Sequence, residues 1–248
     1  MRHVFETMGT VASLELPATD GAASLLGRVE SIFAESDARF SLYRPDSELS
    51  RIAAGQLTLM DASEVMRAAY GEALRWREST AGAFTPNRPD GVTDLNGIVK
   101  ANAIEAAGAQ LDRDGCTDWS LNVGGDILVR GSQPDRTPWS IGVVDPANRS
   151  ELLCAIPLTG GKRAVATSGS TERGDHIWLG SSRAPAPFRQ VTVVAEDIVT
   201  ADVLATAIMA GGRSELDAAS DRWDIDVLTV GRSNEILVTP RLRAAIER

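Results

Sequence analysis

The chain has 248 residues, of which 43% are hydrophobic and 24% charged, and these values are ordinary for a soluble globular protein. Its 34 acidic and 25 basic side chains give a formal net charge of −9 at pH 7. Nucleic-acid binding needs a basic patch, so this balance argues against a nucleic-acid partner. An acidic protein that handles a phosphorylated ligand is expected to use a metal ion to offset the charge repulsion.

The N-terminus and the cysteines point to the cytoplasm. Residues 1–16 lack a charged segment followed by an apolar core, and no apolar run approaches the roughly 20 residues of a membrane span. Cys116 and Cys154 lie far apart without CxxC spacing, so we expect buried thiols rather than a disulfide or a metal site. We therefore expect a cytoplasmic protein without a membrane span, folded as a single domain over residues 1–248.

Hydrophobic periodicity predicts long helices early in the chain and many short strands late, which is typical of an α+β fold. In chain order, the first predicted elements are a strand at 4–17 broken at Gly9, a helix at 22–38, a short helical turn capped by Ser47, and a helix from Asp61 or Ser63 that buries Val65, Met66, Ala69, Leu74 and Trp76. After a turn-rich stretch at 80–97 come a helix from Gly97 to 115, strands at 120–131, 139–146, 151–160, 163–170 and 189–197, a helix at 200–212 and a hairpin at 223–240.

Asp202 and Thr206 lie four residues apart near the start of a predicted helix, and this spacing places both side chains on one helical face. Carboxylate and hydroxyl oxygens are ligands that Mg2+ prefers, with waters and ligand phosphates completing its octahedron. The alternative is that Asp202 serves the helix N-terminus and Thr206 only packs. The spacing alone favours this alternative, since acidic residues are common in first turns.

The segment DLNGIVK at 94–100 combines groups that suit a phosphate. Asp94 precedes Gly97, so a carboxylate and a backbone carbonyl could approach a ligand together. Lys100 is expected in the first turn of the following helix, where an ammonium and the helix-end amides favour an anion. An N-capped helix with a solvated lysine explains the same residues and is favoured in isolation.

Two weaker signals lie in the strand-rich half. Gly124 and Gly125 lie between apolar strand residues, which indicates either a bulge or a close approach of the backbone to a ligand. Residues 167–169 are expected in a turn ahead of His176. His176 follows a polar loop rather than an apolar face, so it could move a proton near neutral pH.

Together and in this order, these segments resemble the ApbE family of FAD:protein FMN transferases. The resemblance is carried by MGT at 8–10, FSLYRPDSELS at 40–50, TAGAF at 80–84, DLNGIVK at 94–100, NVGGDI at 122–127, WSIGVVDP at 139–146, TSGSTERGDHI at 167–177 and the helix that holds Asp202 and Thr206. It covers almost the whole chain, and the ordered set is specific although each segment is not. It implies an ApbE-like, T-fold-like α+β fold of mixed sheets with flanking helices.

The resemblance also implies an activity and a site. Members of the family split the diphosphate of FAD, release AMP and attach FMN through a phosphoester to a Thr or Ser hydroxyl of an acceptor flavoprotein, and Mg2+ bridges the diphosphate. By position, the metal ligands are Gly97, Asp202 and Thr206, and the catalytic residues are His176, Lys100 and Asp202, with His176 the acid or base. FAD is expected against Met8, Tyr43, Ala83, Phe84, Thr85, Asp94, Lys100, Thr167 and Ser168.

The sequence departs from the family pattern around the expected FAD site. Thr85 and Asn87 follow Phe84 where the family has an Asp and later a Thr, and only nine residues separate Phe84 from Asp94. A shorter loop leaves the site more open to water, so hydrolysis of FAD to FMN and AMP is one alternative function. A non-catalytic FAD-binding module is another, and the missing Asp favours it. Tyr43 is either a stacking partner of the flavin ring or an aromatic anchor of its loop.

Overall fold

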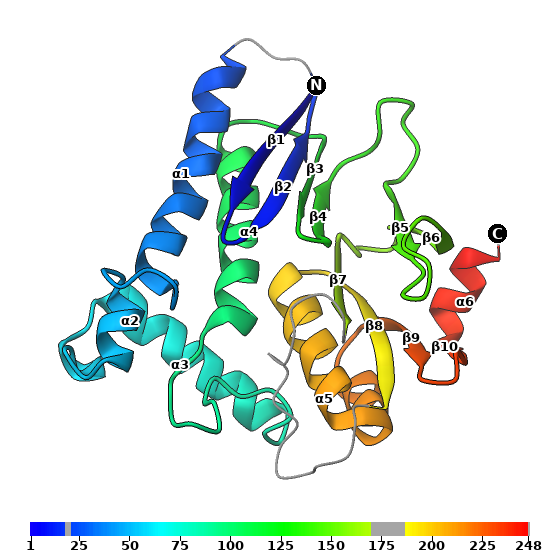
Figure 1. Cartoon of the computed structure of the whole chain (residues 1–248). Coiled ribbons are helices and arrows are strands. Elements are labelled where there is room, and N and C mark those ends of the chain that lie inside the picture. The colour runs from blue at the N-terminus through cyan, green and yellow to red at the C-terminus, as the bar shows by residue number, and fades with distance from the viewer. Residues whose placement is uncertain (18–20, 170–186, 248) are drawn as a thin grey trace.

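The computed structural model describes residues 1–17, 21–169 and 187–247 (Figure 1). Within them, one antiparallel sheet has the strand order β1-β2-β3-β4-β7-β8-β9-β10, and β5 pairs with β6 in a second sheet. The strands are β1 (Arg2–Thr7), β2 (Thr10–Glu15), β3 (Trp119–Val123), β4 (Asp126–Arg130), β5 (Ser140–Val144), β6 (Leu152–Pro157), β7 (Ala164–Gly169), β8 (Phe188–Ala195), β9 (Asp226–Gly231) and β10 (Ile236–Val238). The helices are α1 (Ala22–Phe40), α2 (Glu48–Ala53), the 3-10 turn η1 (Leu59–Asp61), α3 (Glu64–Ser79), α4 (Asn96–Arg113), α5 (Ile198–Arg222) and α6 (Pro240–Ile246).

The long sheet is covered on both faces. Helices α1, α4 and α5 pack on one face, where Phe33 and Trp119 belong to the largest buried cluster. The second sheet and α6 cover the other face over β4, β7, β8 and β9, as Figure 1 shows. Successive residues of a strand point to opposite faces, so Val193 belongs to the helical layer and its neighbour Val194 to the β5–β6 layer. The central strands therefore read as continuous apolar runs.

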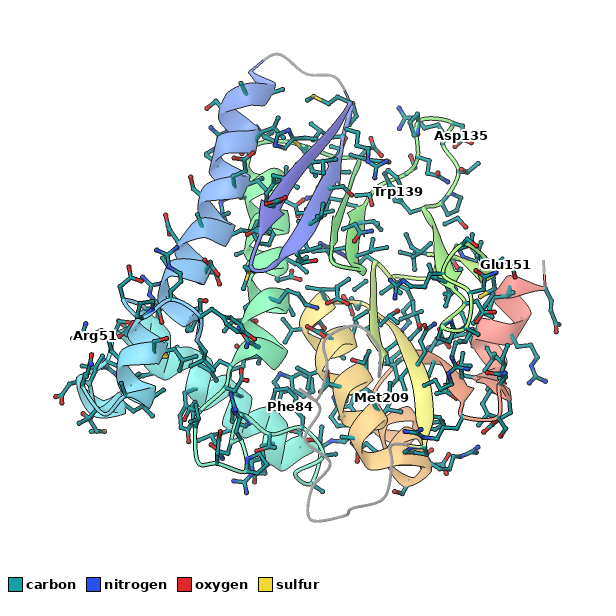
Figure 2. All side chains as sticks on the ribbon, viewed as in Figure 1. Arg51, Phe84, Asp135, Trp139, Glu151 and Met209 are labelled. Carbon is teal, nitrogen blue, oxygen red and sulfur yellow. The ribbon has the colours of Figure 1, made fainter. Side chains whose placement is uncertain are left out.

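A smaller buried cluster joins α2 and α3 to the starts of α4 and α5. Phe84, labelled in Figure 2, belongs to this cluster together with Ile98 of α4 and Val203 of α5. Because these side chains are almost fully buried, they hold the first turns of α4 against α5. Two helices that are about a hundred residues apart in the sequence (Asn96 and Ile198) therefore border the same space.

The α+β fold is confirmed, but two segments expected as interrupted strands are tight hairpins. Met8 and Gly9, with φ of +46° and +71°, turn β1 into β2. Gly124 and Gly125, with φ of +61° and +96°, turn β3 into β4, so of the two alternatives for this pair the bulge is wrong. The backbone at Gly124 does make a close approach, because a Cβ there would lie 2.6 Å from the hydroxyl of Thr10.

The C-terminal third contains more helix than the sequence indicated. The helix expected at 200–212 continues to Arg222, with a single break from helical geometry at Gly212. A further helix, α6, follows the closing hairpin directly, and Pro240 occupies its first position. Proline is favoured there because its fixed φ suits the first turn of a helix and its missing N–H has no partner to lose.

The start of α3 was predicted correctly, but its buried face was not. The hydroxyl of Ser63 accepts the N–H of Met66 at 3.2 Å, so Ser63 is the N-cap. Met66 and Ala69 are buried as expected. Val65 and Leu74 are 48% and 36% exposed, because the packed stripe follows Met66 at helical spacing and they lie beside it.

The cysteines are free thiols, as expected, although both are half-buried rather than fully buried. Burial raises the pKa of both thiols, and nearby carboxylates add to the rise at Cys116. Over the ranges that the structure describes, no helix is long and apolar enough to cross a membrane.

Gly108 of α4 lies where a side chain has no room, so Gly108→Ala is expected to destabilise the fold. A Cβ there would lie 2.8 Å from Cη2 of Trp119 and 2.9 Å from Cδ2 of Leu128, both fully buried. Overpacking costs about 1–3 kcal/mol, more than the roughly 1 kcal/mol that alanine gains over glycine in a helix. Gly71 of α3 is the matched control, because a Cβ there meets only Arg75 at 3.7 Å and Gly71→Ala is expected to stabilise. Urea unfolding measures both, and a stabilised Gly108→Ala variant would contradict the packing argument.

Glu105 of α4 carries a charge that costs stability at neutral pH. Burial raises the pKa of its carboxyl, Asp197 adds to the rise, and Arg163 opposes it. A raised carboxyl pKa means that the folded state favours the protonated form, so stability is greatest at low pH and falls as pH rises through the folded pKa. Glu105→Gln is therefore expected to raise the Tm at pH 7 and to leave it nearly unchanged near pH 4. Thermal unfolding between these pH values tests the trend, and a larger gain at the acidic end would oppose it.

Candidate functional site

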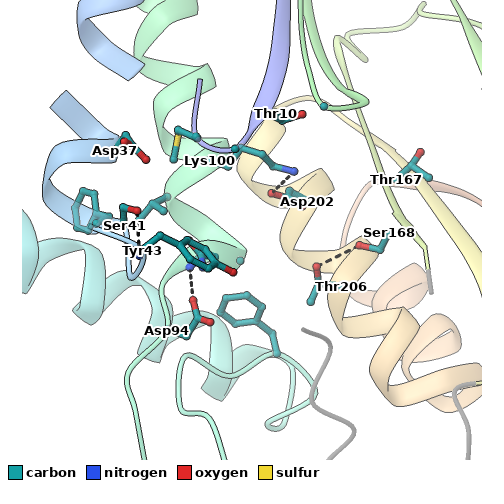
Figure 3. A pocket seen from close by; sticks show the side chains of 18 of the residues that line it. Thr10, Asp37, Ser41, Tyr43, Asp94, Lys100, Thr167, Ser168, Asp202 and Thr206 are labelled. Carbon is teal, nitrogen blue, oxygen red and sulfur yellow. Dashed lines mark hydrogen bonds and ion pairs between the residues drawn. The ribbon is translucent and has the colours of Figure 1, made fainter. Parts of the chain in front are cut away.

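One cavity of about 600 Å3 brings together segments that are far apart in the sequence. The β1–β2 turn, the loop after α1, the start of α4, the end of β7 and one side of α5 all border it (Figure 3). Its volume is in the usual range for small-molecule and cofactor sites. The cavity is lined by every sequence-predicted site residue that the structure describes: Met8, Tyr43, Ala83, Phe84, Thr85, Asp94, Gly97, Lys100, Thr167, Ser168, Asp202 and Thr206. The remaining candidate, His176, lies outside the described residues.

Lys100 is buried between two carboxylates. It is 7% exposed, its Nζ forms an ion pair with Asp126, and the same Nζ lies 3.7 Å from Oδ2 of Asp202. Asp126 and Asp202 are 1% and 6% exposed. The alternative of a solvated lysine is therefore wrong, because an ammonium at this depth needs charged partners and the two carboxylates supply them.

Asp126 is the functional candidate that sequence reasoning missed. It begins β4 directly after the Gly124–Gly125 turn, and its Oδ1 accepts the backbone N–H of Thr167 at 3.2 Å. The sequence contained a signal for Asp126, because this acidic residue lies at the start of an apolar strand, and a buried carboxylate requires a cationic partner. The chain has only two lysines, and the other one, Lys162, pairs with Asp224.

Asp202 and Thr206 project from α5 toward the cavity (Figure 3). Asp197, not Asp202, caps this helix, since its side chain accepts the N–H of Thr200 at 2.7 Å. The hydroxyl of Thr206 lies 3.3 Å from the hydroxyl of Ser168 on β7. The alternative in which Asp202 serves the helix end and Thr206 only packs is therefore wrong.

The start of α4 is shaped by a loop rather than by an N-cap side chain. Oδ1 of Asp94 accepts the N–H of Asn96 at 2.9 Å, one residue before Gly97. A Cβ at Gly97 would lie 2.9 Å from Cε2 of Phe84, so the missing side chain lets the ring of Phe84 pack on the helix backbone. Phe84 is 3% exposed and closes one wall of the cavity. The N–H groups of Asn96, Ile98 and Val99 in this first turn already donate within the protein, to Oδ1 of Asp94 and to the carbonyl of Leu95.

Tyr43 lies at the mouth of the cavity on the loop between α1 and α2. Its side chain is 81% exposed, so the alternative of an aromatic anchor on the core is wrong. The loop is held by other residues: the hydroxyls of Ser47 and Ser50 both donate to the carbonyl of Ser41, at 2.6 and 3.0 Å. The ring is therefore accessible to a flat ligand.

Residues 167–169 belong to β7, which confirms the strand expected at 163–170, and they do not form the turn expected ahead of His176. Thr167 pairs with Thr192 of β8, and Ser168 pairs with Val191. The hydroxyls of Thr167 and Thr192 lie 2.9 Å apart. The pairing with β8 places Thr167 and Ser168 at the cavity wall, and the backbone N–H of Thr167 is accepted by Oδ1 of Asp126.

The oxygen donors of the cavity fit part of a divalent-cation site. Asp202 and Thr206 offer a carboxylate and a hydroxyl one helical turn apart, and Gly97 lines the same cavity. In the described part of the chain, no three His, Cys, Asp or Glu side chains gather closely enough to hold a metal ion. A cation here would need waters or ligand phosphates as well, which is how Mg2+ is commonly bound. Two carboxylates and one ammonium give this buried cluster a formal charge of −1, which favours a cation.

This sheet, with its cavity between α4, β7 and α5, has the architecture of solved flavin transferase structures. Flavin transferase ApbE from Vibrio cholerae matches with a TM-score of 0.81 at 21% identity, over 99% of this chain and 98% of that one. The ApbE protein from Thermotoga maritima matches with a TM-score of 0.84 at 21% identity, over 100% and 99%. At 21% identity, these matches show that this chain shares the fold of those proteins.

The sequence itself shows the family. The profile of the ApbE family matches residues 8–92 and 87–229, so this chain belongs to the ApbE family. A protein of Vibrio cholerae named FAD:protein FMN transferase is 24% identical over 92% of this chain and 86% of its own length. The family and the fold expected from the ordered sequence segments are both confirmed.

Proposed function

We propose that this chain is a FAD:protein FMN transferase that attaches FMN to a Thr or Ser hydroxyl of an acceptor flavoprotein. The main support is the convergence of twelve expected residues on one cavity in a member of the ApbE family. In the proposed reaction, the acceptor oxygen bonds to the phosphorus of the FMN half of FAD. The bond from that phosphorus to the bridging oxygen breaks, AMP leaves, and the hydroxyl proton passes to a base.

Each group in the cavity has a role in this proposal. The ammonium of Lys100 offsets the negative charge of the diphosphate. Tyr43 stacks on the flavin ring at the mouth, and Phe84 forms the apolar wall. The other proposed FAD contacts are Met8, Ala83, Thr85, Asp94, Thr167 and Ser168. The proton acceptor of the proposal is His176.

We also propose that Asp202, Thr206 and the backbone carbonyl of Gly97 hold Mg2+. The position of the carboxylate and the hydroxyl on one face of α5, beside the buried lysine, supports this assignment. Bound there, Mg2+ would supply charge neutralisation on the diphosphate oxygens. The side chains then have to orient the diphosphate and exclude water from the reacting phosphorus.

A gel assay tests the proposed activity. The protein is incubated with FAD, MgCl2 and an acceptor flavoprotein, and a fluorescent acceptor band is expected to survive denaturing electrophoresis. The same acceptor with its target Thr replaced by Ala is the control and is expected to stay dark. Release of FMN and AMP without a band would instead identify a FAD pyrophosphatase. FAD binding that ignores Mg2+, without products, would identify a binding module.

We also propose that the protein is located in the cytoplasm and that residues 1–248 fold as a single domain. Fractionation of the producing cell tests the location. Limited proteolysis tests the domain organisation, and a single resistant core that includes both the α1–α4 half and the α5 half is expected. Two stable fragments that separate after cleavage would contradict it.

A further inference from the structure

We infer that Asp126 is a positioning residue that holds the ammonium of Lys100 away from Asp202, so that the Asp202 carboxylate stays available to a divalent cation. The inference rests on the proposed metal site at Asp202 and Thr206. It adds a residue that is not itself a proposed ligand of the metal or of FAD.

The geometry of the three charges carries the inference. The ammonium of Lys100 is in direct ion-pair contact with Asp126, whereas its distance to Oδ2 of Asp202 is 3.7 Å. Figure 3 shows Lys100 and Asp202 approaching each other from α4 and α5. The lysine is therefore shared unequally, with Asp126 as its nearer partner.

Asp126 is fixed in place, whereas a lysine side chain can move. It is 1% exposed, it begins β4 directly after the Gly124–Gly125 turn, and its Oδ1 accepts the N–H of Thr167 at 3.2 Å. The long side chain of Lys100 has the freedom to shift by an ångström or so toward another carboxylate. The rigid member of the pair therefore decides where the ammonium lies.

Competition for one carboxylate gives this position a functional consequence. An ammonium that pairs closely with Asp202 neutralises it, and a cation must then displace the lysine before it can bind. When Asp126 loses its charge, Asp202 is the carboxylate that remains beside the buried ammonium of Lys100. The attraction between Lys100 Nζ and Asp202 Oδ2 strengthens as the distance between them shortens. Asp126 therefore supports cation binding by satisfying Lys100 elsewhere.

A double-mutant cycle on Mn2+ binding tests the inference. Free Mn2+ is measured by electron paramagnetic resonance, with the metal alone and again with FAD. Asp126→Asn is expected to weaken Mn2+ binding about tenfold in the wild-type background. In the Lys100→Gln background, where no ammonium competes, Asp126→Asn is expected to change binding less than about twofold. The Lys100→Gln change keeps an N–H donor for Asp126.

An equal loss of Mn2+ binding in both backgrounds would overturn the inference, because Asp126 would then act without Lys100. No loss in either background would overturn it as well. If Asp126→Asn alone does not fold, a tenfold loss within the Lys100→Gln background still overturns the inference.

Two further variants separate this inference from the proposed metal site. Asp202→Asn is expected to abolish Mn2+ binding, and if it does not, the metal site itself is wrong. Asp226→Asn is the matched control. Asp226 lies on β9, outside the cavity, and is 6% exposed, and its carboxylate pairs with Arg241 of α6. It is expected to leave Mn2+ binding unchanged.

Discussion

Asp202→Asn is expected to lower the rate of FMN transfer by about 10²–10³-fold, the range seen when a group that stabilises transition-state charge is lost. Asparagine keeps the size of the side chain but removes the charge of a buried oxygen ligand. The gel assay described above measures the rate at fixed FAD, with MgCl2 varied. A variant that keeps the wild-type rate at low Mg2+ would show that Asp202 is not a metal ligand.

The matched control for this change is Asp217→Asn on the same helix. Asp217 is exposed and pairs with Arg213 of the preceding turn at 2.9 Å, and it is not among the residues that line the cavity. Exposed pairs of this kind contribute about 0.2–1 kcal/mol, so neither the rate nor the fold should suffer. Loss of activity in both variants would point to the helix rather than to the carboxylate.

The cavity residues could be predicted from the resemblance to the ApbE family, which the order of the local segments carries, whereas local spacing alone favoured structural roles for Lys100 and Asp202. DLNGIVK places Asp94, Gly97 and Lys100 around a helix start, and the i, i+4 spacing places Asp202 and Thr206 on one face. These relations depend on residues only a few positions apart. The order of such segments along the chain was enough to predict that distant ones meet.

The burial of Lys100 could not be predicted, because its partner Asp126 is 26 residues away on a different element. A local sequence pattern shows where a charged residue lies, but it does not show which oppositely charged residue packs against it in the fold. The same reason explains α6, a short helix that packs on the β5–β6 layer and has little helical periodicity of its own.

Lys100→Met is expected to lower the free energy of unfolding by about 3–5 kcal/mol, the range measured when one partner of a buried ion pair is removed. Asp126 is 1% exposed, and methionine leaves its charge without the contacting ammonium. The hydrogen bond from Thr167 remains, but a neutral amide N–H offsets less of a buried charge than an ammonium does. Urea unfolding measures the change.

The chain provides its own control in Lys162, the second lysine. The side chain of Lys162 is also buried, at 7% exposed, but its partner Asp224 is 73% exposed, so water reaches that carboxylate when the ammonium is removed. Lys162→Met is therefore expected to cost clearly less than Lys100→Met, because it leaves no buried carboxylate without its cation. Adding Asp126→Asn to Lys100→Met removes the stranded charge, so the double variant should recover part of the lost stability. If the double variant is no more stable than Lys100→Met, the instability comes from lost packing of the lysine stem rather than from the buried carboxylate.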